Sequence, residues 1–173
     1  MKQVFLAIRA TVYATAFVAL WAWLAVSVQP LDAKLGLILP RWVQPPGFVI
    51  ATCGAILALS CIVLFVRAGR GTPAPFDPPR EFVASGPYRY VRNPMYIGGL
   101  SVILGAGLIL RSASTACLAL IFTVVIHLFV VFYEEPALER RFGSNYRSYK
   151  HSVRRWLPTR SNAGSAGGGG GVA

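Results

Sequence analysis

Long apolar blocks alternate with short polar segments along the chain, and Arg9 is the only charged residue within the four longest blocks. About 20 apolar residues in a helix cross the hydrocarbon core of a bilayer, so each block predicts a transmembrane helix. The four blocks are residues 4–28, 47–66, 95–110 and 115–133. The pattern therefore predicts an all-α integral membrane protein with about four transmembrane helices.

The last two blocks are separated only by the short polar segment 111–114, which predicts a helical hairpin. Its first arm is the shortest of the four blocks and barely spans a bilayer. In the second block, Gly54 and Ala58 have the small-xxx-small spacing that allows close helix packing in lipid.

The residues after the hairpin predict a different kind of helix. Residues 135–150 carry apolar side chains at four-residue intervals, which gives one apolar face opposite a basic one. These apolar residues are Leu138, Phe142 and Tyr146. We expect a single amphipathic helix along the membrane surface. Residues 1–158 then form one domain, and the Gly-rich residues 159–173 form a disordered tail.

The charge distribution predicts how these helices are oriented across the membrane. The 173 residues include 17 Lys and Arg against 6 Asp and Glu, and only 13% are charged, far fewer than in soluble domains. Most basic residues lie in residues 67–93 or after residue 133, so the positive-inside rule places both segments in the cytoplasm. With four spans, both termini are then cytoplasmic, as in a bacterial cytoplasmic membrane. Anionic lipid headgroups explain the net charge of +11 better than nucleic acid does, so no nucleic-acid partner is expected.

The three cysteines, Cys53, Cys61 and Cys117, all fall inside apolar blocks. An odd number without paired spacing argues against a disulfide framework or a zinc site. No metal site is expected from any residue cluster in the sequence.

Two polar clusters flank the hairpin. Residues 85–99 read SGPYRYVRNPMYIGG, and Glu134 and Glu135 follow the last apolar block directly. Placing an acidic side chain next to a membrane-spanning block costs free energy, so such a residue is by default a candidate for a functional role. Its partner is either Arg89 or Arg92, in a structural salt bridge, or a cation that belongs to a ligand.

S-adenosylmethionine fits such a site, because it carries an amino group, a sulfonium and a carboxylate. Glu134 would bind the amino group, while an arginine, Asn93 or backbone N–H groups near Gly86 would bind the carboxylate. The rings of Tyr88 and Tyr96 would face the sulfonium or the adenine. His127 lies seven residues before Glu134 on nearly the same helix face, where it either contacts substrate or forms an interhelical hydrogen bond.

These two segments resemble a known family. SGPYRYVRNPMYIGG, a hydrophobic hairpin and then FYEEPALERRFGSNYRSYKHSVRRWLP are similar to the isoprenylcysteine carboxyl methyltransferase and phospholipid methyltransferase superfamily of membrane enzymes, over about residues 70–158. The resemblance implies an S-adenosylmethionine-dependent methyltransferase whose lipophilic substrate enters from the bilayer. It implies a cytosol-facing cofactor site formed by Val83, Tyr88, Asn93, Pro94, Met95, Tyr96 and Glu134. Arg92 and Glu135 are the candidates for catalytic contacts with the substrate or the transition state.

The sequence departs from the family pattern at two positions. Asn93 stands where the family usually has His, so proton transfer at that position is not expected. Val130 aligns with the arginine that binds substrate in isoprenylcysteine enzymes. An amine, a thiol, a phospholipid headgroup and an isoprenoid acid therefore remain open as methyl acceptors.

Two other functions are compatible with the pattern. One is a sterol- or steroid-type reductase that uses NADPH, although few basic residues are left for a second phosphate cluster. The other is a non-catalytic membrane scaffold that has kept the helix bundle. The sequence does not indicate an oligomeric state.

Overall fold

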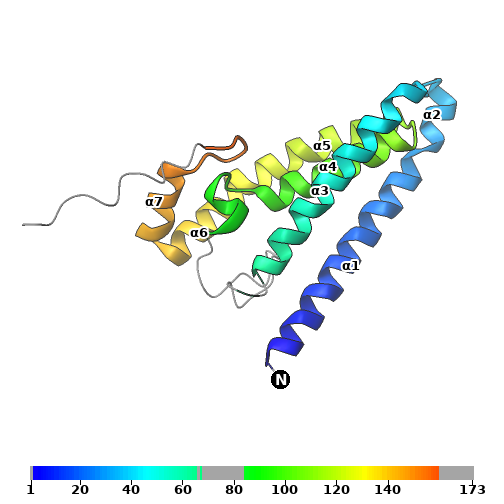
Figure 1. Cartoon of the computed structure of the whole chain (residues 1–173). Helices are drawn as coiled ribbons and strands as arrows, with labels where there is room; N and C mark the ends of the chain where they lie inside the picture. Colours follow the sequence, from blue (N-terminus) through cyan, green and yellow to red (C-terminus); the bar gives the residue numbers. More distant parts are fainter. Residues whose placement is uncertain (1, 66, 68–83, 160–173) are drawn as a thin grey trace, which may run out of the picture.

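The computed structural model describes residues 2–65, 67 and 84–159, and the elements of this part of the chain are helices joined by short irregular segments (Figure 1). The elements are α1 (Lys2–Val28), α2 (Pro30–Leu35), the 3₁₀ turn η1 (Arg41–Val43), α3 (Gln44–Leu64), the 3₁₀ turn η3 (Gly86–Arg89), α4 (Pro94–Ile109), α5 (Ala113–Phe129), the π-helical turn η4 (Val130–Glu134), α6 (Glu135–Phe142) and α7 (Ser144–Ser152). Helices thus cover all four predicted blocks within the described residues.

Two stretches of the described chain, Arg41–Leu64 and Ala113–Phe142, are long and apolar enough to cross a membrane. The helix between them, α4, is apolar but shorter, with 16 residues. This agrees with the prediction that the first arm of the hairpin is the shortest block.

Glycines bring α3 and α4 into direct backbone contact. A Cβ atom added to Gly54 would lie 2.7 Å from the carbonyl oxygen of Gly98, and one added to Gly98 would lie 2.8 Å from the backbone nitrogen of Ala58. Gly105 approaches Ala51 equally closely. The small-residue spacing of Gly54 and Ala58 is therefore confirmed as the packing interface.

The connection between α1 and α3 is more ordered than the loop that its prolines suggest, because it contains α2. Pro45 and Pro46 lie in the first turn of α3, where a missing N–H costs no helical hydrogen bond. The buried Asp32 of α2 accepts a hydrogen bond from the backbone N–H of Ser114 at the start of α5 (2.8 Å). Burial acts to raise the pKa of Asp32, but hydrogen bonds with Ser112 and Ser114 outweigh it and hold this pKa below its usual value.

α5 is also tied to α1. The ring of Trp21 meets that of Phe122 edge to face, with centroids 4.0 Å apart, and the Thr115 hydroxyl donates to the carbonyl of Ala25 (3.3 Å). These contacts place α1 beside the bundle at the end where α2 lies (Figure 1).

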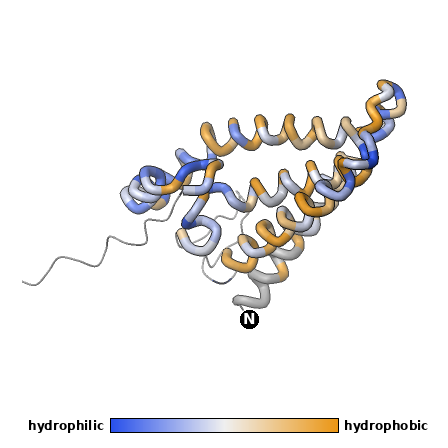
Figure 2. Tube along the Cα trace, turned by 45° about the horizontal axis from the view of Figure 1, so that its top comes forward, coloured by the Kyte–Doolittle hydropathy of each residue, from blue (hydrophilic) through white to orange (hydrophobic). Residues whose placement is uncertain are grey.

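At the opposite end of the bundle, the predicted single helix over residues 135–150 is two helices. The helix is interrupted at Gly143, whose φ of +55° is a conformation that glycine adopts at little cost. α6 continues α5 through η4, and α7 turns back beside it (Figure 1). Figure 2 shows polar residues concentrated on α6 and α7 and apolar residues along the bundle. This polar end holds the predicted site.

Candidate functional site

The turn before α4 is fixed from two sides. Gly86 begins η3 with φ +57°, and this turn buries its own Tyr88 against the ring of Phe65, with centroids 5.4 Å apart. Burial raises the pKa of Tyr88 well above its usual value, and the neighbouring thiol of Cys61 adds to this. The Tyr149 hydroxyl of α7 donates to the Tyr88 carbonyl (2.7 Å). Tyr88 is therefore a neutral, packed phenol that links α3 to α7.

Glu134 has a neutral partner. The Tyr96 hydroxyl donates to its Oε2 atom (2.8 Å), which joins α4 to the end of η4. Glu134 is half-buried and forms no ion pair with any residue that the structure describes. The salt bridge to Arg92, which is one of the two interpretations of this acidic pair, is formed by Glu135 and not by Glu134, and Arg89 is exposed.

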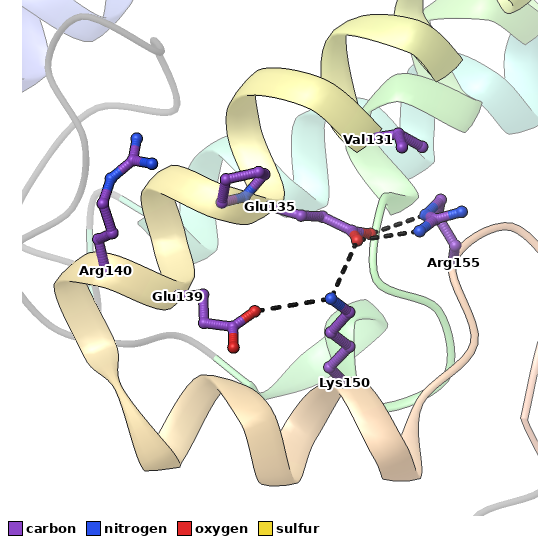
Figure 3. A pocket seen from close by; sticks show the side chains of 7 residues that line it. Val131, Glu135, Glu139, Arg140, Lys150 and Arg155 are labelled. Carbon is purple, nitrogen blue, oxygen red and sulfur yellow. Dashed lines mark hydrogen bonds and ion pairs between the residues drawn. The ribbon is translucent and has the colours of Figure 1, made fainter.

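Glu135, in contrast, is surrounded by cations (Figure 3). Its side chain is only 5% exposed, and Arg155 holds both carboxylate oxygens, at 2.7 and 2.9 Å. Arg92 Nη1 lies 2.9 Å from Oε1, and Lys150 Nζ lies 3.8 Å from Oε2. The Glu135 carboxylate also holds the pKa of Arg155 above its usual value.

The residues that follow α7 form a C-terminal strap, residues 153–159, across the predicted site. Asn93 Nδ2 donates to the Arg155 carbonyl (3.3 Å), and the Arg92 backbone N–H donates to the Arg154 carbonyl (2.9 Å). Thr159, which the sequence places in the disordered tail, donates its N–H to the carbonyl of Tyr90 (2.7 Å).

A side chain of the strap also reaches α5. The Trp156 indole N–H donates to Nδ1 of His127 (2.9 Å), so His127 forms a hydrogen bond with the strap and not with another helix of the bundle. Together with the backbone contacts of residues 90–93, this bond fixes the strap against the turn before α4.

The structure thus brings the predicted residues together in pairs. Tyr96 meets Glu134, and Arg92 meets Glu135. Pro94 is fully buried at the first position of α4, and Met95 beside it is half-buried. Val83 lies outside the described residues.

Sequence reasoning missed Arg155, Lys150 and Tyr149 as members of the site. They lie in α7 and the strap, within the basic segment whose charges we used only for topology. Their pairing with Glu135 and Tyr88 depends on the turn at Gly143, which the apolar periodicity does not reveal.

Beside this network, α6, α7 and the strap border a pocket of about 450 Å³ that is open on one side (Figure 3). Its wall is lined by Val131, Glu135, Pro136, Glu139, Arg140, Lys150 and Arg155.

Comparison with known proteins shows the family of this chain. The model of one family, described as phospholipid methyltransferase, matches residues 45–145, which is more than half of the chain. The chain belongs to the phospholipid methyltransferase family. The resemblance found in the sequence is therefore confirmed, and the match includes both polar clusters of the site.

Individual relatives are similar in sequence. A phosphatidylethanolamine N-methyltransferase of Botryotinia fuckeliana is 31% identical over 153 residues, and one of Aspergillus fumigatus is 27% identical over 153 residues. Each match covers 84% of this chain but only 15% and 16% of the respective relative. This member of the phospholipid methyltransferase family thus spans about one sixth of their length.

A solved structure shares the fold. The eukaryotic intramembrane Ras methyltransferase, isoprenylcysteine carboxyl methyltransferase, aligns with a TM-score of 0.61 at 17% identity, over 83% of this chain and 52% of that one. Together with the apolar helices, this shows that the family member described here is an all-helical membrane protein.

Proposed function

We propose that this protein transfers a methyl group from S-adenosylmethionine to the amine headgroup of a membrane phospholipid. The family match and the fold support methyl transfer and favour it over a reductase or an inactive scaffold. The names of the fungal relatives favour an amine as the acceptor.

The contrast between Glu134 and Glu135 carries the proposal. Glu135 has its charge neutralised by two arginines, whereas Glu134 has only the phenol of Tyr96 within the described residues. A half-buried carboxylate without a cation is costly. A ligand that brings a positive amino group would remove that cost, as the sequence-based assignment of Glu134 requires.

Other groups nearby fit the remainder of the cofactor. Arg92 is nine-tenths buried, and its Nε–H has no hydrogen-bond acceptor among the described residues, so it can bind a carboxylate. The remaining residues of the predicted cofactor site would surround this arginine. They are Tyr88, Asn93, Pro94, Met95 and Tyr96, with Val83 from the preceding segment. When bound, S-adenosylmethionine supplies an electrophilic methyl group and leaves as a neutral thioether.

The protein's own contribution is positioning and exclusion of water. Tyr96 orients the Glu134 carboxylate, and the strap closes over the turn that holds Asn93. Arg92 would bind the carboxylate of the cofactor and so position its methyl group, in place of the contact with substrate or the transition state that the sequence predicts. Glu135 instead acts by holding Arg92 and Arg155 in place, because both of its oxygens are already occupied. Such preorganisation contributes much of the rate in two-substrate transfers.

Val130 bears on the acceptor. Its side chain is only 1% exposed, so a packed apolar residue stands where isoprenylcysteine enzymes carry a substrate-binding arginine. Val130 therefore supplies no cation that would recognise a prenylcysteine carboxylate. This favours an amine headgroup over an acid.

We further propose that α1, α3, α4 and the helix from α5 through η4 all cross the membrane. Both termini and the site then lie in the cytoplasm, in a bacterial cytoplasmic membrane, and α6 and α7 lie at the interface. The basic residues of α6, α7 and the strap support this orientation.

The deciding experiment is calorimetric titration of the detergent-purified protein with S-adenosylmethionine, for wild type and Glu134→Gln. We expect saturable binding that the substitution weakens about tenfold or more, because hydrogen bonds between charged groups contribute about 1.5–3 kcal/mol. The control is Arg154→Gln, an exposed residue next to the site, which should bind as wild type.

The same protein preparation is then assayed for transfer of labelled methyl groups to phosphatidylethanolamine, phosphatidylglycerol and a prenylcysteine. Label in the first lipid alone supports the amine acceptor. A well-folded wild type that binds no S-adenosylmethionine would remove the basis for the proposed reaction.

A further inference from the structure

The pocket of Figure 3 faces away from Glu134. Successive residues of an α-helix point about 100° apart, so Glu134 and the pocket-lining residues of α6 point in different directions. The lining positions Glu135, Pro136, Glu139 and Arg140 are centred nearly opposite Glu134 around the helix axis. A molecule in this pocket therefore lies across the helix from Glu134, and the buried Glu135–Arg92 ion pair separates it from the Nε atom of Arg92 that is proposed to bind the cofactor.

The cations of the pocket have unused binding capacity. Glu135 is already neutralised by Arg92 and Arg155. Lys150 Nζ lies 3.8 and 3.6 Å from the carboxylates of Glu135 and Glu139, beyond hydrogen-bonding distance. Its ammonium group therefore has donors available for another acceptor.

Arg140 adds a second available cation. It is exposed, and its guanidinium has no hydrogen-bond or ion-pair partner among the residues that the structure describes. The wall holds three cations against two carboxylates, and Arg92 adds a fourth positive charge behind Glu135. The chemistry of the pocket thus favours an anion.

The pocket also adjoins an apolar surface. Val124, Leu128 and Phe132 follow one another at four-residue intervals and are 59%, 48% and 76% exposed. Val131 and Pro136 continue this apolar surface into the pocket wall. An occupant that matches both features has an anionic head and hydrocarbon chains.

We propose that this pocket binds the phosphate of an anionic membrane phospholipid, with Lys150 as its ligand, Arg140 turning toward it from the opposite end of the pocket wall (Figure 3), and the acyl chains along the exposed face of α5. Basic pockets at the cytoplasmic end of membrane helices bind such headgroups. This lipid is separate from the methyl acceptor, because it lies across the helix from Glu134. The site does not depend on the proposed reaction.

The test is titration of the detergent-purified full chain with short-chain phosphatidylglycerol at 0.15 M salt, read by native mass spectrometry. A Lys or Arg next to an anionic headgroup contributes about fivefold in affinity, so Arg140→Gln with Lys150→Gln should weaken binding at least about tenfold. The matched control, Arg141→Gln with Arg154→Gln, removes the same charge from exposed positions outside the pocket wall and should change binding less than about twofold.

Arg140→Gln alone keeps the test valid if the double variant unfolds, since its side chain has no partner in the described structure to lose. It should weaken binding about fivefold. Equal losses in the pocket and control pairs would show surface electrostatics only and overturn the proposal. Competition by millimolar inorganic phosphate with equal potency would also overturn it, because the site would then bind a free anion.

Discussion

At the scale of single residues, two adjacent glutamates have opposite surroundings. Glu134 accepts one hydrogen bond from a phenol, and Glu135 is held by two arginines and approached by a lysine. Because neighbouring positions on a helix point in different directions, one acid faces α4 and the other faces α7 and the strap. This contrast agrees with the proposal that Glu134 binds a ligand while Glu135 stabilises the structure.

Arg155→Gln tests the structural half of this division. The substitution removes the bidentate partner of the buried Glu135 carboxylate, while Arg92 still compensates its charge, so we expect a loss of about 1.5–3 kcal/mol in the free energy of unfolding. Arg154→Gln, whose side chain is exposed, should stay within about 0.5 kcal/mol of wild type. Denaturant unfolding in detergent, followed by circular dichroism, measures both.

Equal stability of the two variants would mean that the Arg155–Glu135 contact contributes nothing to the fold. Loss of S-adenosylmethionine affinity in Arg155→Gln at temperatures where it remains folded would instead show that the strap also orders Asn93, whose side chain donates to the Arg155 carbonyl.

The sequence showed which residues of the site are polar and near each other, but not how they pair. Tyr96 and Glu134 lie on opposite arms of a hairpin, so their meeting follows from its antiparallel geometry. The choice of Arg155 for Glu135 follows from a turn of the backbone after α6, which depends on one glycine. Side-chain periodicity carries no information about such a turn.

At the scale of elements, α3 and α4 depend on glycines that leave no room between the two backbones. Gly98 and Gly99 are neighbours in α4, yet a Cβ at Gly98 would meet backbone atoms at 2.7 and 2.8 Å, whereas one at Gly99 would meet nothing within 4 Å. Substitutions at these two positions therefore test how closely α3 and α4 pack.

Gly98→Ala should lower the free energy of unfolding by about 1–3 kcal/mol, because the helices must move apart. Gly99→Ala should be neutral or stabilising by up to about 1 kcal/mol, since alanine favours the helix more than glycine does. Unfolding in matched detergent compares them. Similar values for the two variants would show that α3 and α4 are not in close contact.

The elements themselves were largely predictable, because a run of some 20 apolar residues has few alternatives to a helix. The exceptions were short. α2 forms in a connection whose prolines suggest a loop, and the helix expected over residues 135–150 is divided at Gly143. In both places a local backbone preference overrides the hydropathy pattern.

At the scale of the whole molecule, polar residues concentrate at the two ends of an apolar bundle (Figure 2). One end holds α2 and its contact with Ser114, and the other holds the site, α6 and α7 (Figure 1). In the proposed arrangement of spans, these ends face different compartments.

Lys34→Cys in α2 and Ser148→Cys in α7 test that orientation, since both positions are exposed. A membrane-impermeant thiol reagent added to intact cells should label the first, and only permeabilised cells should allow labelling of the second. The wild-type cysteines, all within α3 and α5, provide the background. Labelling of both variants from outside would contradict the proposed arrangement of spans.

The π-helical turn η4 has a consequence for how this enzyme family varies. A π turn holds one residue more than an α-helical turn, and it precedes Glu135 directly. Loss of a single residue from Val130–Glu134 would turn the π turn back into an α-helical turn, because both kinds of turn cover nearly the same rotation of the chain. α6 and Glu135 would then keep their direction relative to α5, whereas residues inside the shortened turn would point elsewhere. The extra residue therefore lets the surroundings of Glu134 change without disturbing the ion pairs of Glu135, and a family member with a shortened turn would keep those ion pairs.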